Sequence, residues 1–419
     1  MKFQTLDQWL RWQESLHPSA IDLGLERPGR VLDALGLRHP DHAVITVAGT
    51  NGKGSSVAML ESILRAAGYR VGCYTSPHLL RYNERVRIDG EPVDDYQLCE
   101  AFERIDQARG DTSLTYFEFG TLAALDIFAR AGLDVAVLEV GMGGRLDAVN
   151  LLDADVALVT AIDVDHAAWL GNDREAIGRE KAGIFRPGRP AVCSDPNPPQ
   201  SLLQHGRELN TALYCLGKEF RYTAGAGQWT WAGPGTSYEA LPEPALRGDF
   251  QLQNAAGVAM VLSLLGERLP VTAAQIRQGL LSVSLPGRFQ LLPGAPATIV
   301  DVAHNPQSAA ALAANLKAQM VRGRTLAVVG VLADKDLAGV IRPMLPCVDL
   351  WYPAGLAVPR GGDSRTLHQA IAGLGGAVEH DYPTVGEALA AARSRAQPDD
   401  RIVVFGSFYT VAEALLEAV

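Results

Sequence analysis

The segment VAGTNGKGSS, residues 47–56, decides how the rest of the chain is interpreted. An apolar run, VITV at 44–47, precedes its loop, and SSVAMLESILRAAG at 55–68 follows with apolar residues at helical spacing and Gly68 as the expected helix stop. A strand, a glycine-rich loop and a helix in this order suit a phosphate, because the N–H groups at a helix N-terminus favour an anion. The segment therefore predicts a phosphate-binding loop.

The loop differs from the common P-loop pattern G-x-x-x-x-G-K-[ST]. Val47 stands where that pattern has its first glycine, and Gly54 follows Lys53 in place of a hydroxyl residue. The alternative is a glycine-rich turn without a ligand, but the strand and the helix on its two sides favour phosphate binding. ATP is preferred to a dinucleotide, because the loop is not of the G-x-G-x-x-G type.

Composition and charge narrow the class of partner. The 419 residues are 47% hydrophobic and 20% charged, which is typical of a globular protein of two or three domains. A net charge of −10 without a Lys/Arg-rich run argues against nucleic acid and membrane partners and favours small molecules. The five cysteines form no C-x-x-C pair, and the amphipathic start is neither a signal peptide nor a membrane span. We therefore expect a cytoplasmic protein with reduced thiols.

Short apolar runs alternate with helical patterns along most of the chain. This alternation predicts an α/β fold with a parallel sheet covered on both faces. Residues 194–244 are interpreted as an insertion of short antiparallel strands at the edge of the first domain, and the Pro-Gly turn in SLPGRFQ (284–290) as a domain boundary. The predicted domains are 1–285 and 286–419, with a ligand cleft beside the boundary. The runs are VITV (44–47), DVAVLEV (134–140), DVALVTAI (155–162), TIVDVAH (298–304), LAVVGVL (326–332) and IVVFGS (402–407).

Polar residues follow several of the expected strands, where ligands gather in open parallel sheets. Glu139 ends one run, and Ser76 follows the strand RVGCY (70–74). One carboxylate and one hydroxyl suit Mg²⁺, which keeps phosphates and waters among its ligands. The alternative for Glu139 is an ion pair with Arg145, because a charged group at the end of an apolar strand must be paired or bind a metal.

A second group, Asp163, Asp165 and His166, follows the run 155–162. His166 suits a metal by its place at a strand end, and it equally suits a hydrogen-bonded structural role. Lys181, in REKAGIF, is interpreted from its neighbours as an ordinary solvated helix lysine.

Eight stretches, in this order along the chain, together resemble one family: GTNGKGS, TSPHLLRYNERVRI, LTYFEFGT, LEVGMGGRLDAVN, DVDHAAWLG, REKAGIF, LPGRFQ and DVAHNP. They are similar to the folylpolyglutamate synthase and dihydrofolate synthase family of the Mur ligase superfamily. The match runs from about residue 21 to FGSFYT at 405–410. The resemblance implies an N-terminal Mur-ligase-like P-loop ATPase domain and a smaller C-terminal Rossmann-like glutamate-ligase domain, which close on each other during the reaction.

The resemblance also implies a reaction. ATP phosphorylates the carboxylate of a pteroate or folate, and the amino group of L-glutamate attacks the acyl phosphate, giving an amide, ADP and phosphate. IDLGLER, LTYFEFGT and DVDHAAWLG look most like the bacterial type that uses both dihydropteroate and tetrahydrofolates. The alternatives are polyglutamylation alone and an ATP-hydrolysing switch protein. A cell-wall Mur ligase is disfavoured, because only 48 residues precede Gly49 and its uridine-nucleotide domain would not fit there.

Site residues are implied by position within the matching motifs. Nucleotide contacts are expected from Gly49, Thr50, Asn51, Gly52, Lys53, Gly54, Ser55, Asn254, Arg288 and Asp301, with Asp301 at the ribose. Ser76 and Glu139 would bind one Mg²⁺ and His166 a second, and Glu139, His166 and a carbamylated Lys181 would form the catalytic group. The pteroate is expected at Asp22, Leu23, Gly24, Leu25, Thr115, Tyr116, Phe117, Glu118, Leu146, Asp147 and Ala148, and glutamate at His304 and Ser407.

Some of these residues also have simpler structural interpretations. Phe117 and Phe119 suit a hydrophobic core, Asn254 suits a helix cap, and Asn305 with Pro306 suits a helix N-cap and first position. Val302 stands where many members of the family have glycine, which leaves Asp301 and His304 in place. A monomer is expected.

Overall fold

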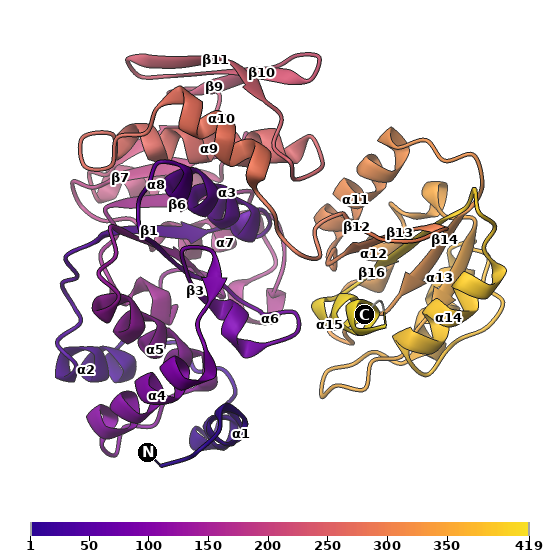
Figure 1. The fold of residues 1–419 in the computed structure, drawn as a ribbon, viewed down its shortest axis with the longest axis horizontal. Coiled ribbons are helices and arrows are strands. Elements are labelled where there is room, and N and C mark those ends of the chain that lie inside the picture. The colour runs from indigo at the N-terminus through magenta and orange to yellow at the C-terminus, as the bar shows by residue number, and fades with distance from the viewer. Residues whose placement is uncertain (1, 418–419) are drawn as a thin grey trace. The chain divides into compact units, whose positions relative to one another are not determined.

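The structure is a computed structural model and describes residues 2–417. Its contacts divide the chain into two compact units, drawn together in Figure 1. The first unit is Met1–Ala245 with Gln251–Ser284, and the second is Leu246–Phe250 with Leu285–Val419. Each unit has its own sheet and its own hydrophobic core.

The first unit contains an 8-stranded sheet of order β4-β3-β2-β5-β1-β6-β7-β8. The six strands β2, β5, β1, β6, β7 and β8 are parallel to their neighbours in this order. Strands β3 and β4 add an antiparallel edge beside β2. The central strands β1, β5 and β6 are buried at every position and apolar except at Thr46 and Glu139, as expected of a parallel sheet covered on both faces. This confirms the predicted fold class. The strands are β1 Ala43–Ala48, β2 Val71–Tyr74, β3 Val86–Ile88, β4 Glu91–Pro92, β5 Val135–Glu139, β6 Val156–Val159, β7 Pro190–Cys193 and β8 Ala212–Cys215.

Helices cover both faces of this sheet (Figure 1). The group α1 Leu6–Leu16, α2 Glu26–Ala34, α4 Asp95–Arg109 and α5 Tyr116–Arg130 packs together on one face, and α3 Lys53–Ala66, α9 Phe250–Leu264 and α10 Ala273–Ser282 lie on the other. Capping boxes fix the first turns of α1, α4 and α5. The remaining helices of this unit are η1 Tyr82–Arg85, η2 Ala148–Leu151, α6 Ala167–Leu170, α7 Arg174–Ala182 and α8 Gln200–Glu208.

The predicted insertion is shorter than the sequence suggested. Residues 200–215 form α8 and β8, and β8 pairs in parallel with β7, so this part extends the main sheet. Only the 3-stranded antiparallel sheet of β9 Arg221–Ala224, β10 Gln228–Gly233 and β11 Thr236–Pro242 is added to the unit. Trp231 anchors it, because its buried indole Nε1 donates to the carbonyl of Ala256 in α9 at 3.1 Å. The expectation of antiparallel strands is confirmed for β9 to β11 and was wrong for α8 and β8, because the four-residue strand ALYC gives too weak a pattern to stand out.

The second unit contains a 5-stranded sheet of order β12-β13-β16-β14-β15, in which only β12 is antiparallel to its neighbour. Asn305 caps α11 with Pro306 in the first turn, as the sequence predicted. The strands are β12 Gln290–Leu292, β13 Ala297–Asp301, β14 Thr325–Val329, β15 Leu350–Pro353 and β16 Arg401–Phe405. The helices are α11 Pro306–Ala318, α12 Leu337–Ile341, η3 Leu345–Cys347, α13 Ser364–Gly373, α14 Val385–Arg395 and α15 Phe408–Leu416.

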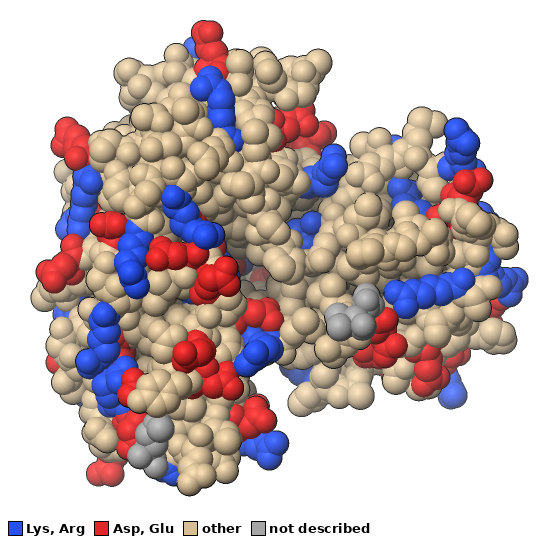
Figure 2. All heavy atoms as spheres, in the orientation of Figure 1, with Lys and Arg blue, Asp and Glu red and all other residues tan. Residues whose placement is uncertain are grey.

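The helices of the described residues and the charges on the face in Figure 2 bear on the expected partners. Across residues 2–417, every helix is too short or too polar to cross a lipid bilayer. Figure 2 shows Lys and Arg side chains interspersed with Asp and Glu over the face in view.

Candidate active site

The loop between β1 and α3 is held in a backbone conformation that suits glycine. Gly49 and Gly52 have φ angles of +149° and +93°. A Cβ atom on Gly49 would lie 1.8 Å from the hydroxyl oxygen of Thr160, and one on Gly52 would lie 2.4 Å from the amide oxygen of Asn254. The glycines therefore let the loop press against the end of β6 and against α9.

Hydrogen bonds fix the loop to the segment that follows β6. The Thr160 hydroxyl donates to the carbonyl of Asn51 at 2.8 Å. The Thr50 hydroxyl donates to the carbonyl of Asp163 at 2.9 Å and accepts from the N–H of Asp163 at 3.0 Å. The Lys53 ammonium lies 3.1 Å from the carbonyl oxygen of Gly49 and 3.2 Å from that of Thr50. A positive charge thus lies inside the curve of the loop, at the first residue of α3.

Two buried amides of α9 lie against this loop. Gln251 Nε2 donates to the Ser55 hydroxyl at 3.3 Å, and Asn254 Nδ2 donates to Gln251 Oε1 at 3.0 Å. Asn254 lies within α9 rather than at its end, so its interpretation as a helix cap was wrong. Gln251 was missed, although two amides three residues apart in a largely apolar helix lie on one face of that helix.

Glu139 and Ser76 meet at the same edge of the sheet. Glu139 is the last residue of β5, pairs in register with Val47 of β1, and is only 5% exposed. Its Oε2 accepts a hydrogen bond from the backbone N–H of Ser76 at 3.3 Å. Arg145 instead forms its ion pair with Glu180 of α7 at 2.8 Å, so the predicted alternative partner for Glu139 was wrong.

The donor set at this edge fits a hard cation. A carboxylate and a hydroxyl residue offer the oxygen ligands that Mg²⁺ prefers. Among the residues that the structure describes, no group of three or more His, Cys, Asp or Glu side chains is arranged to hold a metal. Nucleotide oxygens and waters would therefore complete the coordination of a magnesium ion here.

Lys181 is buried, contrary to the expectation of a solvated lysine. It is 3% exposed and shares a face of α7 with the buried Ile177, four residues earlier. Burial and then the nearby charge of Lys53 lower its pKa to about 7, against the opposing influence of Asp165 and Asp147. The spacing from Ile177 was the sequence signal that the interpretation from its neighbours overlooked, whereas the family resemblance had placed Lys181 in the catalytic group.

His166 lies on the loop that Thr50 holds. It is exposed, has a φ of +51°, and its backbone carbonyl accepts the N–H groups of Trp169 and Leu170 at 2.9 and 3.1 Å, which begins α6. Its backbone N–H donates to the carboxylate of Asp165 at 2.8 Å. The loop therefore brings both residues to the edge of the sheet where β6 ends, and a metal-binding role for His166 stays a prediction.

Two of the predicted pteroate segments are joined by Arg27, which the sequence did not single out. Its guanidinium donates to the carboxylate of Asp22 at 2.5 Å and to that of Glu118 at 2.9 Å. Glu118 also accepts the N–H of Thr115 at 2.7 Å within the capping box of α5. The segments 22–25 and 115–118 are thus tied together by one partly buried network.

The third predicted segment lies next to Phe117. A Cβ atom on Gly141 would lie 2.6 Å from the Phe117 ring and 3.3 Å from a carboxylate oxygen of Asp147. Asp147 accepts the N–H groups of Met142 and Val149 at 2.8 and 2.9 Å, and burial raises the pKa of its carboxyl to about 6. Phe119, by contrast, is fully buried among aromatic residues, as its core interpretation predicted.

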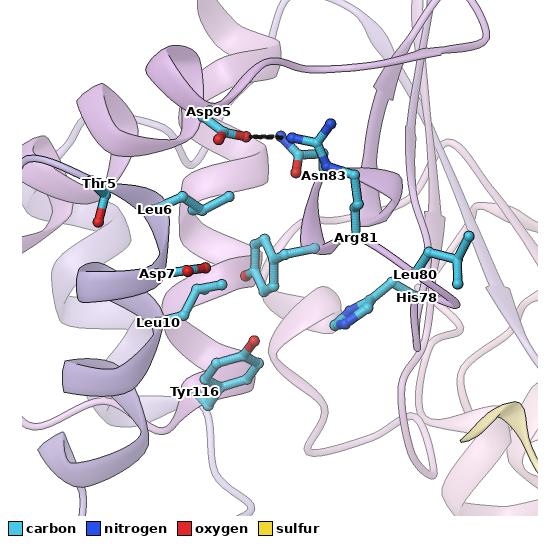
Figure 3. A pocket seen from close by; sticks show the side chains of 11 residues that line it. Thr5, Leu6, Asp7, Leu10, His78, Leu80, Arg81, Asn83, Asp95 and Tyr116 are labelled. Carbon is cyan, nitrogen blue, oxygen red and sulfur yellow. Dashed lines mark hydrogen bonds and ion pairs between the residues drawn. The ribbon is translucent and has the colours of Figure 1, made fainter. Parts of the chain in front are cut away.

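A pocket of about 400 Å³ lies beside Tyr116 and was not predicted. Figure 3 shows side chains of α1 on one side of it and of the segment after Ser76 on the other. Arg85 supports this wall, because its Nε donates to His78 Nδ1 at 2.8 Å and its guanidinium lies 5.7 Å from the Tyr116 ring centre. The lining residues are Thr5, Leu6, Asp7, Leu10, His78, Leu80, Arg81, Tyr82, Asn83, Asp95 and Tyr116.

The candidate residues of the second unit lie where β13 and β16 end. Asp301 accepts the N–H groups of Phe289 and Ala303, both at 2.8 Å, and burial raises the pKa of its carboxyl. Arg288 and His304 both lie beside the ring of Phe408, at 5.7 and 6.3 Å. Ser407 accepts the N–H of Thr410 at 3.0 Å as the N-cap of α15. These residues are close in this unit, and their roles stay predictions.

Comparisons with known proteins agree in both units. The family model described as Mur ligase middle domain matches residues 47–262, and that described as Mur ligase, glutamate ligase domain matches residues 287–408. The chain is 47% identical to a dihydrofolate synthase/folylpolyglutamate synthase of Escherichia coli strain K12, covering 98% of this chain and 94% of that protein. It is 40% identical to the protein of that name from Haemophilus influenzae, covering 97% and 96%.

Solved structures of similar proteins agree with these sequence matches. E. coli FolC in complex with DHPP and ADP has a TM-score of 0.94 and 46% identity, covering 99% of this chain and 97% of that one. A bifunctional folylpolyglutamate synthase/dihydrofolate synthase with Mn, AMPPNP and L-glutamate bound has a TM-score of 0.91 and 46% identity, covering 99% and 98%.

Proposed function

Because the chain belongs to the dihydrofolate synthase/folylpolyglutamate synthase family of Mur-type ligases, we propose that it adds L-glutamate to dihydropteroate and to tetrahydrofolates at the expense of ATP. The single observation that carries this proposal is the meeting of three features at one edge of the first sheet. They are the glycine-constrained phosphate loop, the Ser76–Glu139 pair, and the buried Lys181, whose pKa the charge of Lys53 helps to lower. Residues 1–285 would bind ATP, and residues 286–419 would supply the glutamate-ligase part.

Phosphoryl transfer is the first step in this proposal. The pteroate carboxylate attacks the γ-phosphorus of ATP, an O–P bond forms, and ADP leaves. The N–H groups at the start of α3 and the Lys53 ammonium would hold the phosphates and stabilise the charge that spreads over them. Asn254 of α9, Arg288 and Asp301 are the further proposed nucleotide contacts.

Ser76, Glu139 and His166 are the proposed ligands of two Mg²⁺ ions. When bound, Mg²⁺ neutralises charge on the transferring phosphoryl group. Glu139 suits this role, because it brings a buried carboxylate to the end of β5, beside the backbone of Ser76.

We propose that Lys181 is carbamylated in the active enzyme. With a pKa of about 7, a large share of its amine is neutral near neutral pH. The neutral nitrogen attacks CO₂, an N–C bond forms, a proton leaves, and the side chain ends in a carboxylate. An anion suits the charge of Lys53 better than a second ammonium does. Carbon-13 NMR of the enzyme under ¹³C-bicarbonate should show the carbamate, whereas fully active enzyme with only free amine would contradict it.

Amide formation is the second step. The amino group of L-glutamate attacks the acyl carbon and forms an N–C bond. Phosphate then leaves with the electron pair of the broken C–O bond, and the nitrogen releases a proton. Phe117 offers a ring face and Asp147 a carboxylate to a pterin, whose flat ring carries N–H donors. His304 and Ser407 are the proposed glutamate contacts.

ATP and L-glutamate are cytoplasmic metabolites, so we propose that the enzyme acts in the cytoplasm. We propose in addition that it is a monomer.

Phosphate release tests the function. A ligase should release phosphate only when ATP, L-glutamate and a pteroate are all present, and mass spectrometry should then detect the glutamylated product. Equal release without glutamate would support an ATP-hydrolysing switch protein instead. Comparing dihydropteroate with a tetrahydrofolate as the acceptor separates dual activity from polyglutamylation alone.

A further inference from the structure

Arg87 connects three elements that surround the proposed phosphoryl-transfer site. It lies on β3, opposite Cys73 of β2, and its side chain is 16% exposed. Its guanidinium donates to the Glu61 carboxylate at 2.9 Å, to the Thr75 hydroxyl at 3.1 Å and to the carbonyl of Glu84 at 3.2 Å. One side chain therefore bridges the phosphate-loop helix α3, the end of β2 and the short helix η1.

The contact with Glu61 reaches the phosphate loop. Glu61 lies eight residues after Lys53 in α3, about two turns along the same helix. Its carboxylate is almost fully buried, and a buried carboxylate needs a charged or hydrogen-bonding partner. Arg87 Nε also lies 3.4 Å from the other carboxylate oxygen, Glu61 Oε1, which gives the pair a fork-like geometry. Arg87 thus holds the helix that carries Lys53, two turns after the phosphate loop.

The contacts with Thr75 and Glu84 hold the segment that carries Ser76. The Thr75 N–H donates to the carbonyl of Arg85 at 2.9 Å, so the two ends of the segment 75–85 are also tied to each other. Next to Thr75, the Ser76 N–H donates to Glu139 at 3.3 Å. Arg87 has in addition a favourable electrostatic interaction with Glu139.

We propose that Arg87 is a positioning residue for phosphoryl transfer, which fixes Ser76 and Glu139 relative to the phosphate loop. The proposal rests on the proposed function, because it takes Ser76 and Glu139 as metal ligands. Arginine suits this position, since its planar fork of five donors reaches a carboxylate and two further oxygens at once. A lysine could keep the charge near Glu61, but it could not hold all three groups in this geometry.

The test removes one contact and leaves the ligands in place. Thr75→Val replaces the hydroxyl that accepts from Arg87 by a methyl group, and Thr75→Ser keeps the hydroxyl as the matched control. Binding of Mn²⁺ is followed by its electron paramagnetic resonance signal in the presence of AMPPNP. We expect Thr75→Val and Arg87→Lys to weaken Mn²⁺ binding by about 10-fold, the usual effect of losing a group that orients a metal ligand. Thr75→Ser should stay within about 2-fold of the wild type, because its hydroxyl can still accept from Arg87.

Two outcomes would overturn the proposal. One is a lower melting temperature in Thr75→Val and Arg87→Lys with unchanged Mn²⁺ binding, which would make Arg87 a purely structural residue. The other is equal weakening in Thr75→Val and Thr75→Ser, which would exclude the hydroxyl as the cause. The proposed function fails separately, since it would be contradicted by wild-type enzyme that releases phosphate without glutamate, whatever these variants do to Mn²⁺ binding.

Discussion

At the scale of single residues, Lys53 carries the most direct prediction. Its ammonium lies inside the curve of the phosphate loop, 3.1 Å from the carbonyl of Gly49. Lys53→Ala should lower kcat/KM by about 100-fold or more, which is on the order of 3 kcal/mol of transition-state stabilisation. The reason is that the mutation removes the positive charge that stabilises the transferring phosphoryl group. Steady-state kinetics measure the loss, and Lys218→Ala, which removes an exposed lysine, is the control. Near-normal turnover of Lys53→Ala would exclude its role at the phosphates.

Asp147 predicts a pH dependence of stability. Burial raises the pKa of its carboxyl from 3.8 to about 6. Between these values the folded state binds more protons than the unfolded state, so this group's contribution to stability is present at low pH and is lost as pH rises through about 6. Relative to Asp147→Asn, the free energy of unfolding of the wild type should fall by on the order of 3 kcal/mol across this window. Urea unfolding at several pH values measures it, and parallel profiles for the two proteins would contradict it.

Single residues also show where sequence reasoning stops. The motifs placed Glu139 at a strand end, and the structure puts it there beside Ser76. The neighbours of Lys181 predicted a solvated lysine, but the fold buries it on the face that it shares with Ile177. Arg145 was the predicted alternative partner of Glu139, yet it pairs with Glu180. Ion pairs between distant segments depend on three-dimensional placement, which neither motif nor periodicity encodes.

At the scale of elements, the junction of β1 and α3 predicts a difference between two glycines. Gly52 and Gly68 have similar φ angles, +93° and +87°, but only a Cβ on Gly52 would clash, at 2.4 Å from Asn254. Gly68→Ala should therefore cost only the backbone strain of about 1–2 kcal/mol. Gly52→Ala should cost more and should also weaken AMPPNP binding by about 10-fold or more, because the loop must move. Thermal unfolding and calorimetric titration measure both effects, and wild-type nucleotide binding by Gly52→Ala would refute the claim.

The elements themselves were largely predictable where they are long and apolar. The strands predicted from six apolar runs are present, and Gly68 follows the end of α3 as expected. The edge strand β8 was missed, because four residues beside a loop give too weak a pattern. Of the two buried amides of α9, Asn254 was predicted as a site residue and Gln251 was not. The reason is that their partner, the phosphate loop, lies about 200 residues away in the sequence.

At the scale of the whole molecule, the fold class followed from the alternation of strands and helices, and the family motifs identified the ligase chemistry. Three long-range arrangements needed the structure. They are the Arg27 bridge between Asp22 and Glu118, the bridge that Arg87 forms between α3 and the end of β2, and the pocket beside Tyr116. Each joins segments that share no local pattern, so no single stretch of sequence could predict it.

The central claim is that ATP activates the pteroate carboxylate as an acyl phosphate before glutamate attacks. The most direct test uses dihydropteroate labelled with ¹⁸O at both carboxylate oxygens, together with ATP, L-glutamate and Mg²⁺. The account predicts that one ¹⁸O atom from the carboxylate appears in the released inorganic phosphate for each amide formed, because the labelled oxygen that attacks phosphorus leaves with it. Inorganic phosphate without ¹⁸O, formed alongside glutamylated product, would contradict the account.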